Sequence, residues 1–260
     1  MKVAVCGAAG RMGREVCRAV AAEEDMELVC AVDPAAAGAS LRQLVPDLPV
    51  ELEVQPDLSA LEGSGAEAMV DFTVAAAARR NIPSALKMGI HVVAGTTGLE
   101  RKDLERFAEL AEKNGVACLV APNFALGAVL MIHFAEVAAR FMPECEIIEL
   151  HHPFKLDAPS GTAALTAERI ASTRKIPAGS TGKASPPSRG EDREGVRLHS
   201  VRLPGLVAHQ EVIFGGVGQT LTIRHDSLDR TSFMPGVIFA LRRVAEYPGL
   251  TVGLEKWMGL

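Results

Sequence analysis

The sequence has few aromatic residues, an acidic net charge and no long apolar run, and each of these excludes a class of protein. Aromatic side chains make up only 4% of the 260 residues, too few for the base-stacking platforms of single-strand nucleic-acid binders. A net charge of -5 offers no basic stripe to a phosphate backbone. No apolar run is long enough to span a bilayer, and no charged-then-apolar leader precedes the first strand pattern. We expect a cytoplasmic protein that binds neither nucleic acid nor membrane.

Cysteine is scarce as well, and its placement excludes a disulfide framework. The five cysteines are odd in number, scattered, and lack the spacing of metal ligands. Cys6 and Cys118 lie in apolar strand patterns, which favours reduced thiols in a protein core. We therefore predict no metal site.

What the chain does contain is an ordinary globular composition, with 48% apolar and 23% charged residues. A chain of this length forms one large domain or two modest ones, with a sizeable core. The N-terminus carries the first specific pattern. A strand over residues 2–6 runs into the glycine-rich turn 7–13, and an amphipathic helix follows over residues 14–20. Strand, glycine turn and helix together predict a dinucleotide site, because the helix N-terminus binds a pyrophosphate.

The choice of dinucleotide depends on Asp33, at the end of a second strand over residues 27–32. An acidic residue at this distance from the glycine turn accepts hydrogen bonds from the adenosine ribose. Pro34 and three alanines follow it, so no adjacent cation would meet a ribose 2'-phosphate. We predict that NADH is preferred and NADPH is the second cofactor, unless Arg11 or Arg42 reaches the phosphate.

Strands and helices continue to alternate as far as residue 124, a rhythm that predicts a doubly wound parallel sheet. The expected strands are 68–72, 90–94 and 116–120, and the expected helices are 75–88 and 100–114, the last ending at Gly115. In such sheets ligands bind beyond the carboxyl ends of the strands. The polar turns at 71–73, 95–98 and 121–124 all fall there, so we expect them to form the rim of one pocket.

The second half changes in character. It begins with a long apolar helix (125–141), one strand (146–150) and a capped helix (161–172). A long loop (174–195) follows, then three strands of period two (196–202, 207–214 and 219–225) and a last helix (234–246). Consecutive strands of period two predict an antiparallel sheet. We expect an α/β fold, with a Rossmann-like dinucleotide-binding domain (1–124 and 231–260) and an α+β substrate and oligomerisation domain (125–230) whose sheet is mostly antiparallel.

Residues 151–162, HHPFKLDAPSGT, are the most informative stretch. His151, His152 and Lys155 leave a strand end and run directly into a helix N-terminus at Gly161. Unpaired helix amides beside an ammonium and two imidazoles suit an anionic substrate and a proton donor that works near neutral pH. The alternative is a surface His-His pair followed by a plain helix cap; the combination with Lys155 argues against it.

With these motifs the chain resembles one family, the dihydrodipicolinate reductases (4-hydroxy-tetrahydrodipicolinate reductases) of the diaminopimelate route to lysine. Five motifs in order carry the resemblance: residues 5–13, 71–73, 95–98, 121–124 and 151–163. The resemblance implies NAD(P)H-dependent reduction of a small dicarboxylate, a fold like the one predicted above, and a homotetramer formed through the second sheet.

The resemblance also implies roles for individual residues. His151 would be the proton donor and acceptor, and Lys155 the proton donor. The dicarboxylate would be bound by His152, Gly161 and Thr162. The cofactor would be bound by Gly7, Ala8, Ala9, Gly10, Arg11, Met12, Asp33, Gly95, Thr96, Thr97, Ala121, Pro122, Asn123 and Phe124.

Two other functions compete with this interpretation. An aspartate or homoserine dehydrogenase-like reductase would share the glycine turn but has no reason to carry residues 151–162. A non-catalytic NAD-binding sensor would tolerate the loss of Lys155, whereas here the cation is present.

Overall fold

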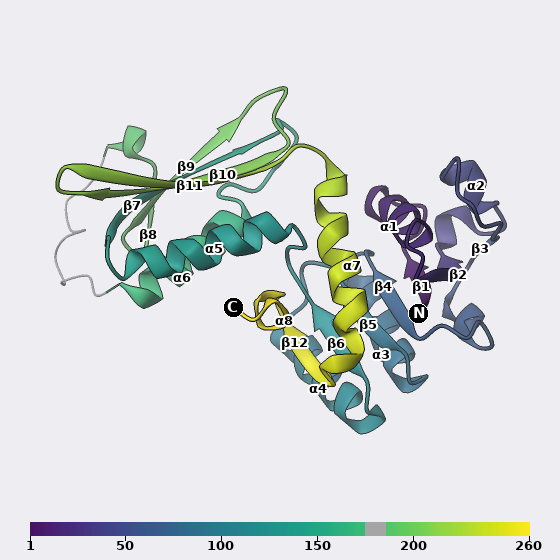
Figure 1. Cartoon of the computed structure of the whole chain (residues 1–260). Helices are drawn as coiled ribbons and strands as arrows, with labels where there is room; N and C mark the ends of the chain where they lie inside the picture. The colour runs from purple at the N-terminus through teal and green to yellow at the C-terminus, as the bar shows by residue number, and fades with distance from the viewer. Residues whose placement is uncertain (175–185) are drawn as a thin grey trace. The chain divides into compact units, whose positions relative to one another are not determined.

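The computed structural model describes residues 1–174 and 186–260, which divide into two compact units (Figure 1). Unit 1 comprises Met1–Phe124 and Phe233–Leu260, and unit 2 comprises Ala125–Ser232. The C-terminal segment therefore belongs to the same unit as the N-terminal half. Among the described residues, no helix has both the length and the apolar character that a membrane span needs.

Unit 1 is built on a parallel sheet of seven strands, in the order β12-β6-β5-β4-β1-β2-β3. The strands are β1 (Lys2–Cys6), β2 (Glu27–Val32), β3 (Val54–Gln55), β4 (Ala68–Asp71), β5 (His91–Ala94), β6 (Ala117–Val120) and β12 (Gly249–Val252). The helices are α1 (Arg11–Ala21), α2 (Leu41–Leu44), α3 (Ala75–Lys87), α4 (Arg101–Asn114), α7 (Met234–Arg243) and α8 (Glu255–Met258). The predicted Rossmann-like α/β fold is confirmed.

The sequence explains why these elements form. β1 and β4 are short apolar runs whose residues 3–6 and 68–71 are all buried, as expected for strands covered on both faces. The helix predicted to end at Gly115 does so, with Gly115 in the left-handed conformation. A capping box between Glu100 and Asp103 begins the same helix. β12 was not predicted; it pairs in parallel with β6 at the edge of the sheet.

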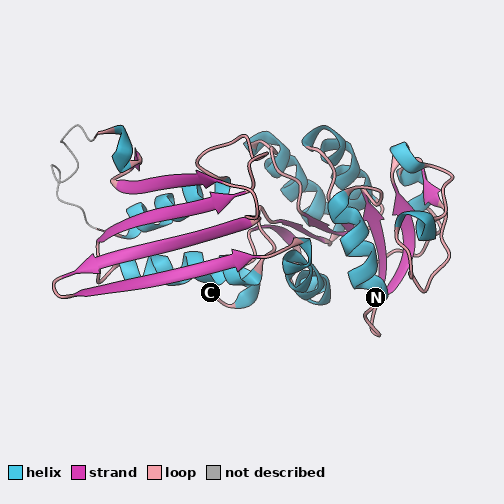
Figure 2. Ribbon diagram, turned by 90° about the horizontal axis from the view of Figure 1, so that it is seen from above, coloured by secondary structure: helices cyan, strands magenta, loops and turns pink. Residues whose placement is uncertain are grey.

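Unit 2 contains a mixed sheet of five strands, in the order β11-β10-β7-β9-β8 (Figure 2). The strands are β7 (Glu144–His151), β8 (Glu191–Arg193), β9 (Val196–Arg202), β10 (Ala208–Gly216) and β11 (Gln219–Ser227), and the helices are α5 (Leu126–Ala139) and α6 (Gly161–Thr173). Three of the strand pairs are antiparallel, and β7 with β9 is parallel. The sheet is thus mostly antiparallel, as predicted.

Two details of unit 2 differ from the prediction. β9 and β10 are consecutive in the chain but do not pair, because β7 lies between them and pairs with both. The expected loop over 174–195 was wrong at its end, where residues 191–193 form β8 against β9. The part of that loop over 175–185 lies outside the described residues.

Helices α5 and α6 lie on the same face of the unit 2 sheet (Figures 1 and 2). Their small and apolar residues form one core with the inward side chains of the strands, among them Ile147, Val212 and Phe214. Side chains alternate along β7, so Ile148 and Leu150 point to the opposite face, where they are only half-buried. No described helix of unit 2 covers that face.

The five cysteines are all buried and unpaired. Burial raises the pKa of the Cys17 and Cys118 thiols to about 12. They are therefore inert core residues rather than nucleophiles.

Candidate active site

The predicted cofactor residues all lie in unit 1, at the carboxyl edge of its sheet. Cys6, Asp71 and Ala94 are aligned across β1, β4 and β5, and Ala94 is aligned with Val120 of β6. The turns that follow these strands therefore begin at the same level. They contain the residues predicted from the sequence: Gly7, Ala8, Ala9 and Gly10; Gly95, Thr96 and Thr97; Ala121, Pro122, Asn123 and Phe124.

The glycine turn packs tightly against the first turn of α1. Gly7 has a φ of +80°, and a Cβ at Gly13 would lie 1.9 Å from the Gly7 carbonyl oxygen, so neither position accepts a side chain without distortion. Gly10 is the N-cap of α1, and no side chain caps that helix or places an acid in its first turn. The amides at Arg11 and Met12 thus face outward at the positive end of the helix dipole, as a pyrophosphate requires.

Asp33 links this turn to the second strand. Its Oδ2 accepts a hydrogen bond from Ala9 N at 3.0 Å, and its Oδ1 accepts one from Ala35 N at 3.0 Å. A carboxylate has about four lone-pair positions, so two hydroxyl donors can still be accommodated. Asp33 also lines a cavity of about 520 Å³ together with Gly7 and Gly10. These residues fit a dinucleotide whose ribose contacts Asp33 and whose phosphates rest on α1.

A buried carboxylate that the sequence analysis did not assign organises the neighbouring turns. Asp71 is fully buried, and its Oδ1 accepts hydrogen bonds from Thr73 N, Thr73 Oγ1 and Thr96 Oγ1 at 3.0, 2.7 and 2.8 Å. Its Oδ2 accepts one from Asn81 Nδ2 at 2.9 Å. The turns after β4 and β5 are therefore held together by one buried carboxyl group, which fixes the position of Thr96 on the rim.

Aromatic packing fixes the same region. A Cβ at Gly95 would lie 2.1 Å from the Phe72 ring, so a side chain at this position would displace that ring. The Phe72 ring in turn packs against Phe124, with centroids 5.6 Å apart. Three predicted turns are thus in direct contact. Arg80, which the sequence analysis also missed, lines the same cavity as Asp33.

The predicted catalytic and substrate residues lie in unit 2, where β7 ends and α6 begins. His151 is the last residue of β7, and its Nδ1 is hydrogen-bonded to Oε2 of Glu149. Glu149 is completely buried. Burial alone would raise the pKa of Glu149, but hydrogen bonds from His151, Arg202 and Ser200 lower it to about 2. His151 is thus oriented by an ionised carboxylate, and Nε2 is its other ring nitrogen.

Lys155 lies in the turn after β7, where its backbone N–H donates to His152 O at 3.2 Å. Its ammonium donates to both carboxylate oxygens of Asp157 at 2.8 Å. That hydrogen bond lowers the pKa of Asp157. Arg202 donates to the Asp157 carbonyl oxygen at 2.7 Å, so the turn is anchored to β9.

Two of the predicted substrate-binding residues, Gly161 and Thr162, begin α6, and the third, His152, directly follows β7. Ser160 is the N-cap, and its Oγ accepts a hydrogen bond from Ala163 N at 3.2 Å. Gly161 is exposed, and open space surrounds the position a Cβ would take. Nδ1 of His152 is buried and has no hydrogen-bond partner among the described residues. An unpartnered imidazole nitrogen in the turn that leads to α6, whose first turn contains Thr162, fits a bound carboxylate.

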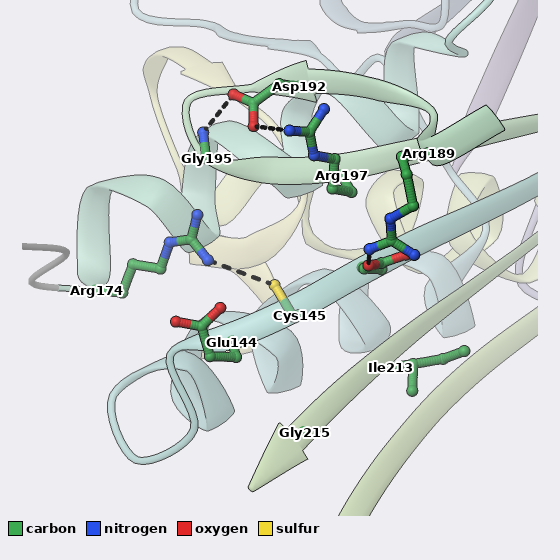
Figure 3. Close-up of a pocket in the computed structure, with 10 residues that line it drawn as sticks. Glu144, Cys145, Arg174, Arg189, Asp192, Gly195, Arg197, Ile213 and Gly215 are labelled. Carbon is green, nitrogen blue, oxygen red and sulfur yellow. Dashed lines mark hydrogen bonds and ion pairs between the residues drawn. The ribbon is translucent and has the colours of Figure 1, made fainter. Parts of the chain in front are cut away.

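A separate cavity of about 480 Å³ lies at the opposite end of β7, around Glu144 and Cys145 (Figure 3). Two ion pairs lie within the cavity, Arg189 with Glu146 and Arg197 with Asp192 at 3.4 Å, and Arg174 donates to the Pro143 carbonyl oxygen at 2.6 Å. No group of three or more His, Cys, Asp or Glu side chains in residues 1–174 and 186–260 is arranged to bind a metal.

The structure thus connects His151 and Lys155 through residues that sequence reasoning missed. The sequence contained one indication that Glu149 contacts His151: it lies two residues earlier and therefore on the same face of a strand. Arg202 is 53 residues away from Glu149 in the chain, and nothing in the sequence indicated that the two are in contact.

Comparison with known proteins identifies the family for both halves of the chain. The family model described as dihydrodipicolinate reductase, N-terminus, matches residues 1–124, and the corresponding C-terminus model matches residues 127–258. The chain is 45% identical to the 4-hydroxy-tetrahydrodipicolinate reductase of Desulfitobacterium hafniense, covering 99% of this chain and 98% of the relative. It is 48% identical to that of Moorella thermoacetica, covering 98% and 97%.

Solved structures give the same result. A dipicolinate-bound dihydrodipicolinate reductase from Paenisporosarcina sp. TG-14 superimposes with a TM-score of 0.85 and 41% identity, covering 98% of each chain. An amine dehydrogenase from Mycobacterium smegmatis shares the fold alone, with a TM-score of 0.67 and 12% identity. From the two matched family models and the relatives that span its whole length, the chain belongs to the dihydrodipicolinate reductase family.

Proposed function

We propose that this protein reduces 4-hydroxy-tetrahydrodipicolinate to tetrahydrodipicolinate with a nicotinamide cofactor, the substrate's hydroxyl leaving as water, in the diaminopimelate route to lysine. The observation that carries the proposal is the cluster at the end of β7. There His151 is oriented by a buried carboxylate, and Lys155, whose ammonium is bonded to Asp157, lies in the turn between β7 and α6. Relatives named for this activity are 45% and 48% identical over almost the whole chain, which supports the same assignment.

Unit 1 would bind the cofactor, which supplies a hydride when bound. The α1 amides at Arg11 and Met12 would hold the pyrophosphate, and Asp33 the adenosine ribose. The turns steadied by Asp71 would position the nicotinamide ring. NADH should be preferred, because a 2'-phosphate would meet the Asp33 carboxylate, which Pro34 follows. Arg80 lines the same cavity and gives NADPH one compensating cation.

Unit 2 would bind the substrate and supply the proton. Reduction leaves an electron pair on the substrate that a proton must meet, and the Lys155 ammonium, with its three donors, can deliver it. His151 would exchange protons at Nε2 while Nδ1 stays bonded to Glu149. His152, Gly161 and Thr162 would hold the carboxylates, which agrees with the dipicolinate named for the Paenisporosarcina relative.

We further propose that four chains assemble through the open face of the unit 2 sheet. Ile148, Leu150, Val201 and Ile213 are only half-buried on that face, and no described helix of unit 2 covers them. Light scattering should give a mass four times the 27.5 kDa of one chain. A monomer mass would contradict this assembly but leave the chemistry unaffected.

The activity is tested by loss of NADH absorbance with substrate generated in place, from pyruvate and aspartate semialdehyde by the preceding synthase. Oxidation that requires every component supports the proposal. NADH binding without oxidation would retain the dinucleotide unit and refute the assigned reaction.

A further inference from the structure

Glu149 lies at the centre of a hydrogen-bond network that the proposed roles of His151 and Lys155 do not explain. It is fully buried on β7, the middle strand of the unit 2 sheet, between Gln210 of β10 and Ser200 of β9. Both of its oxygens are used. Oε2 is bonded to His151 Nδ1 and accepts from Arg202 Nη1 at 2.9 Å, and Oε1 accepts from Arg202 Nη2 at 2.8 Å.

An ionised carboxylate accepts hydrogen bonds but donates none. While Glu149 is charged, His151 must therefore carry a proton on Nδ1, and Nε2 is left as the nitrogen that can exchange a proton with the substrate. The same arrangement orients the catalytic imidazole of serine proteases, where replacing the acid by its amide leaves the geometry but gives the wrong tautomer. Glu149 thus selects both the tautomer and the ring orientation of His151.

Arg202 extends this control to the other catalytic group. Its Nη2 donates to the Asp157 carbonyl oxygen at 2.7 Å as well as to Glu149, and its Nη1 also donates to Val201 O at 2.8 Å. The Asp157 side chain in turn accepts both hydrogen bonds from Lys155. One planar guanidinium is therefore fixed to the acid behind His151 and to the turn that carries Lys155, a set of contacts that lysine cannot reproduce.

We propose that Glu149 and Arg202 are positioning residues that set His151 and Lys155 relative to each other. This inference rests on the proposed reductase function. Neither side chain needs to touch the substrate. Their effect is exerted through the proton position on His151 and the backbone at Asp157.

The decisive variant is Glu149→Gln, because it keeps the shape of the side chain and removes the charge. We expect kcat to fall by ~100- to ~10⁴-fold, as is typical when a catalytic imidazole loses its orienting acid. The KM for the dicarboxylate and the affinity for NADH should change far less, since the proposed binding groups are untouched. Arg202→Lys should lower kcat at least ~10-fold by releasing the turn around Asp157.

A matched control is available on the same strand. Glu146 also bonds a histidine and an arginine, namely His199 Nε2 at 2.7 Å and Arg189, but it lies three residues before Glu149 on β7 and so points to the opposite face of the strand. Glu146→Gln removes the same charge from the same kind of triad. It should leave kcat at the wild-type value.

Nitrogen NMR of the histidine rings provides a readout that a purely structural role would not alter. In the wild-type protein at neutral pH the His151 ring, assigned by its loss in His151→Gln, should be protonated at Nδ1. In Glu149→Gln the Nε2-protonated tautomer should increase.

Lower kcat with the changed tautomer supports the inference. Wild-type kcat per folded molecule with an unchanged tautomer overturns it, even if the protein melts at a lower temperature. If Glu149→Gln does not fold, the kcat of Arg202→Lys decides in the same way. An inactive wild-type enzyme would refute the reductase function instead, and the tautomer measurement would still report on Glu149.

Discussion

The packing of Gly13 against the glycine turn gives a sharp test of how the cofactor is bound. In Gly13→Ala the new Cβ would lie 1.9 Å from the Gly7 carbonyl oxygen and 2.8 Å from Ala8 Cα. Ordinary contacts begin at 3.4 Å, so the turn and α1 must separate by about 1.5 Å. Because both atoms belong to backbone, no side-chain rotation relieves the overlap.

The expected loss follows from the donors that this shift displaces. Hydrogen bonds to a charged group contribute ~1.5–3 kcal/mol each, so losing two amides to the pyrophosphate costs ~3–6 kcal/mol of binding. At 1.4 kcal/mol for each factor of ten, the dissociation constant for NADH should rise at least ~100-fold. Overpacking itself costs ~1–3 kcal/mol, which should leave the protein folded.

Calorimetric titration with NADH measures this effect, and Gly215→Ala is its control. Gly215 lies in unit 2, and nothing surrounds the position of its Cβ within 4 Å. The control should bind NADH as the wild-type protein does. If Gly13→Ala remained folded and bound NADH within ~3-fold of wild type, the pyrophosphate would not rest on α1.

Three further predictions concern chemistry, cofactor and pH. Lys155→Ala should lower turnover at least ~100-fold while NADH binding persists, and near-normal turnover would remove Lys155 from its role. NADH should bind more tightly than NADPH because Pro34, and not a cation, follows Asp33. The reverse order in a calorimetric titration would contradict this and would indicate that Arg80 binds the 2'-phosphate. The pKa of Glu149 lies at about 2, below its ordinary 4.5, so its stabilisation is complete above pH 4.5 and is lost as the pH falls through 2. Urea unfolding should show this loss, of about 3 kcal/mol, in the wild-type protein and not in Glu149→Gln; equal pH profiles would contradict it.

The features predicted correctly from the sequence are those whose signal lies within one short stretch. β1, the glycine turn and α1 are consecutive, so their pattern and their contact are encoded together. Gly115 ends α4 where predicted because a left-handed residue is a local requirement. The site predicted over residues 151–162 also depends on one short stretch of the chain, and the roles of its residues stay predictions.

The features that were missed depend on partners distant in the chain. Strands β9 and β10 have the same period of two, and nothing local indicates that β7 separates them. β12 is four residues long and has one buried side chain, Thr251, so it shows no hydrophobic pattern that predicts a strand. Its strand conformation comes from pairing with β6. In the sequence Arg202 is an ordinary polar residue of a strand, and only the folded sheet places it in contact with Glu149.

The transfer of hydride to the substrate ring is the central chemical claim, and labelled cofactor tests it most directly. NADH carrying deuterium at the transferable position of nicotinamide carbon four should be oxidised by the wild-type protein with substrate generated in place. The product, examined by mass spectrometry, should carry one deuterium from the cofactor when the reaction runs in ordinary water. Product without deuterium, or NADH left unoxidised, would contradict the proposed reaction.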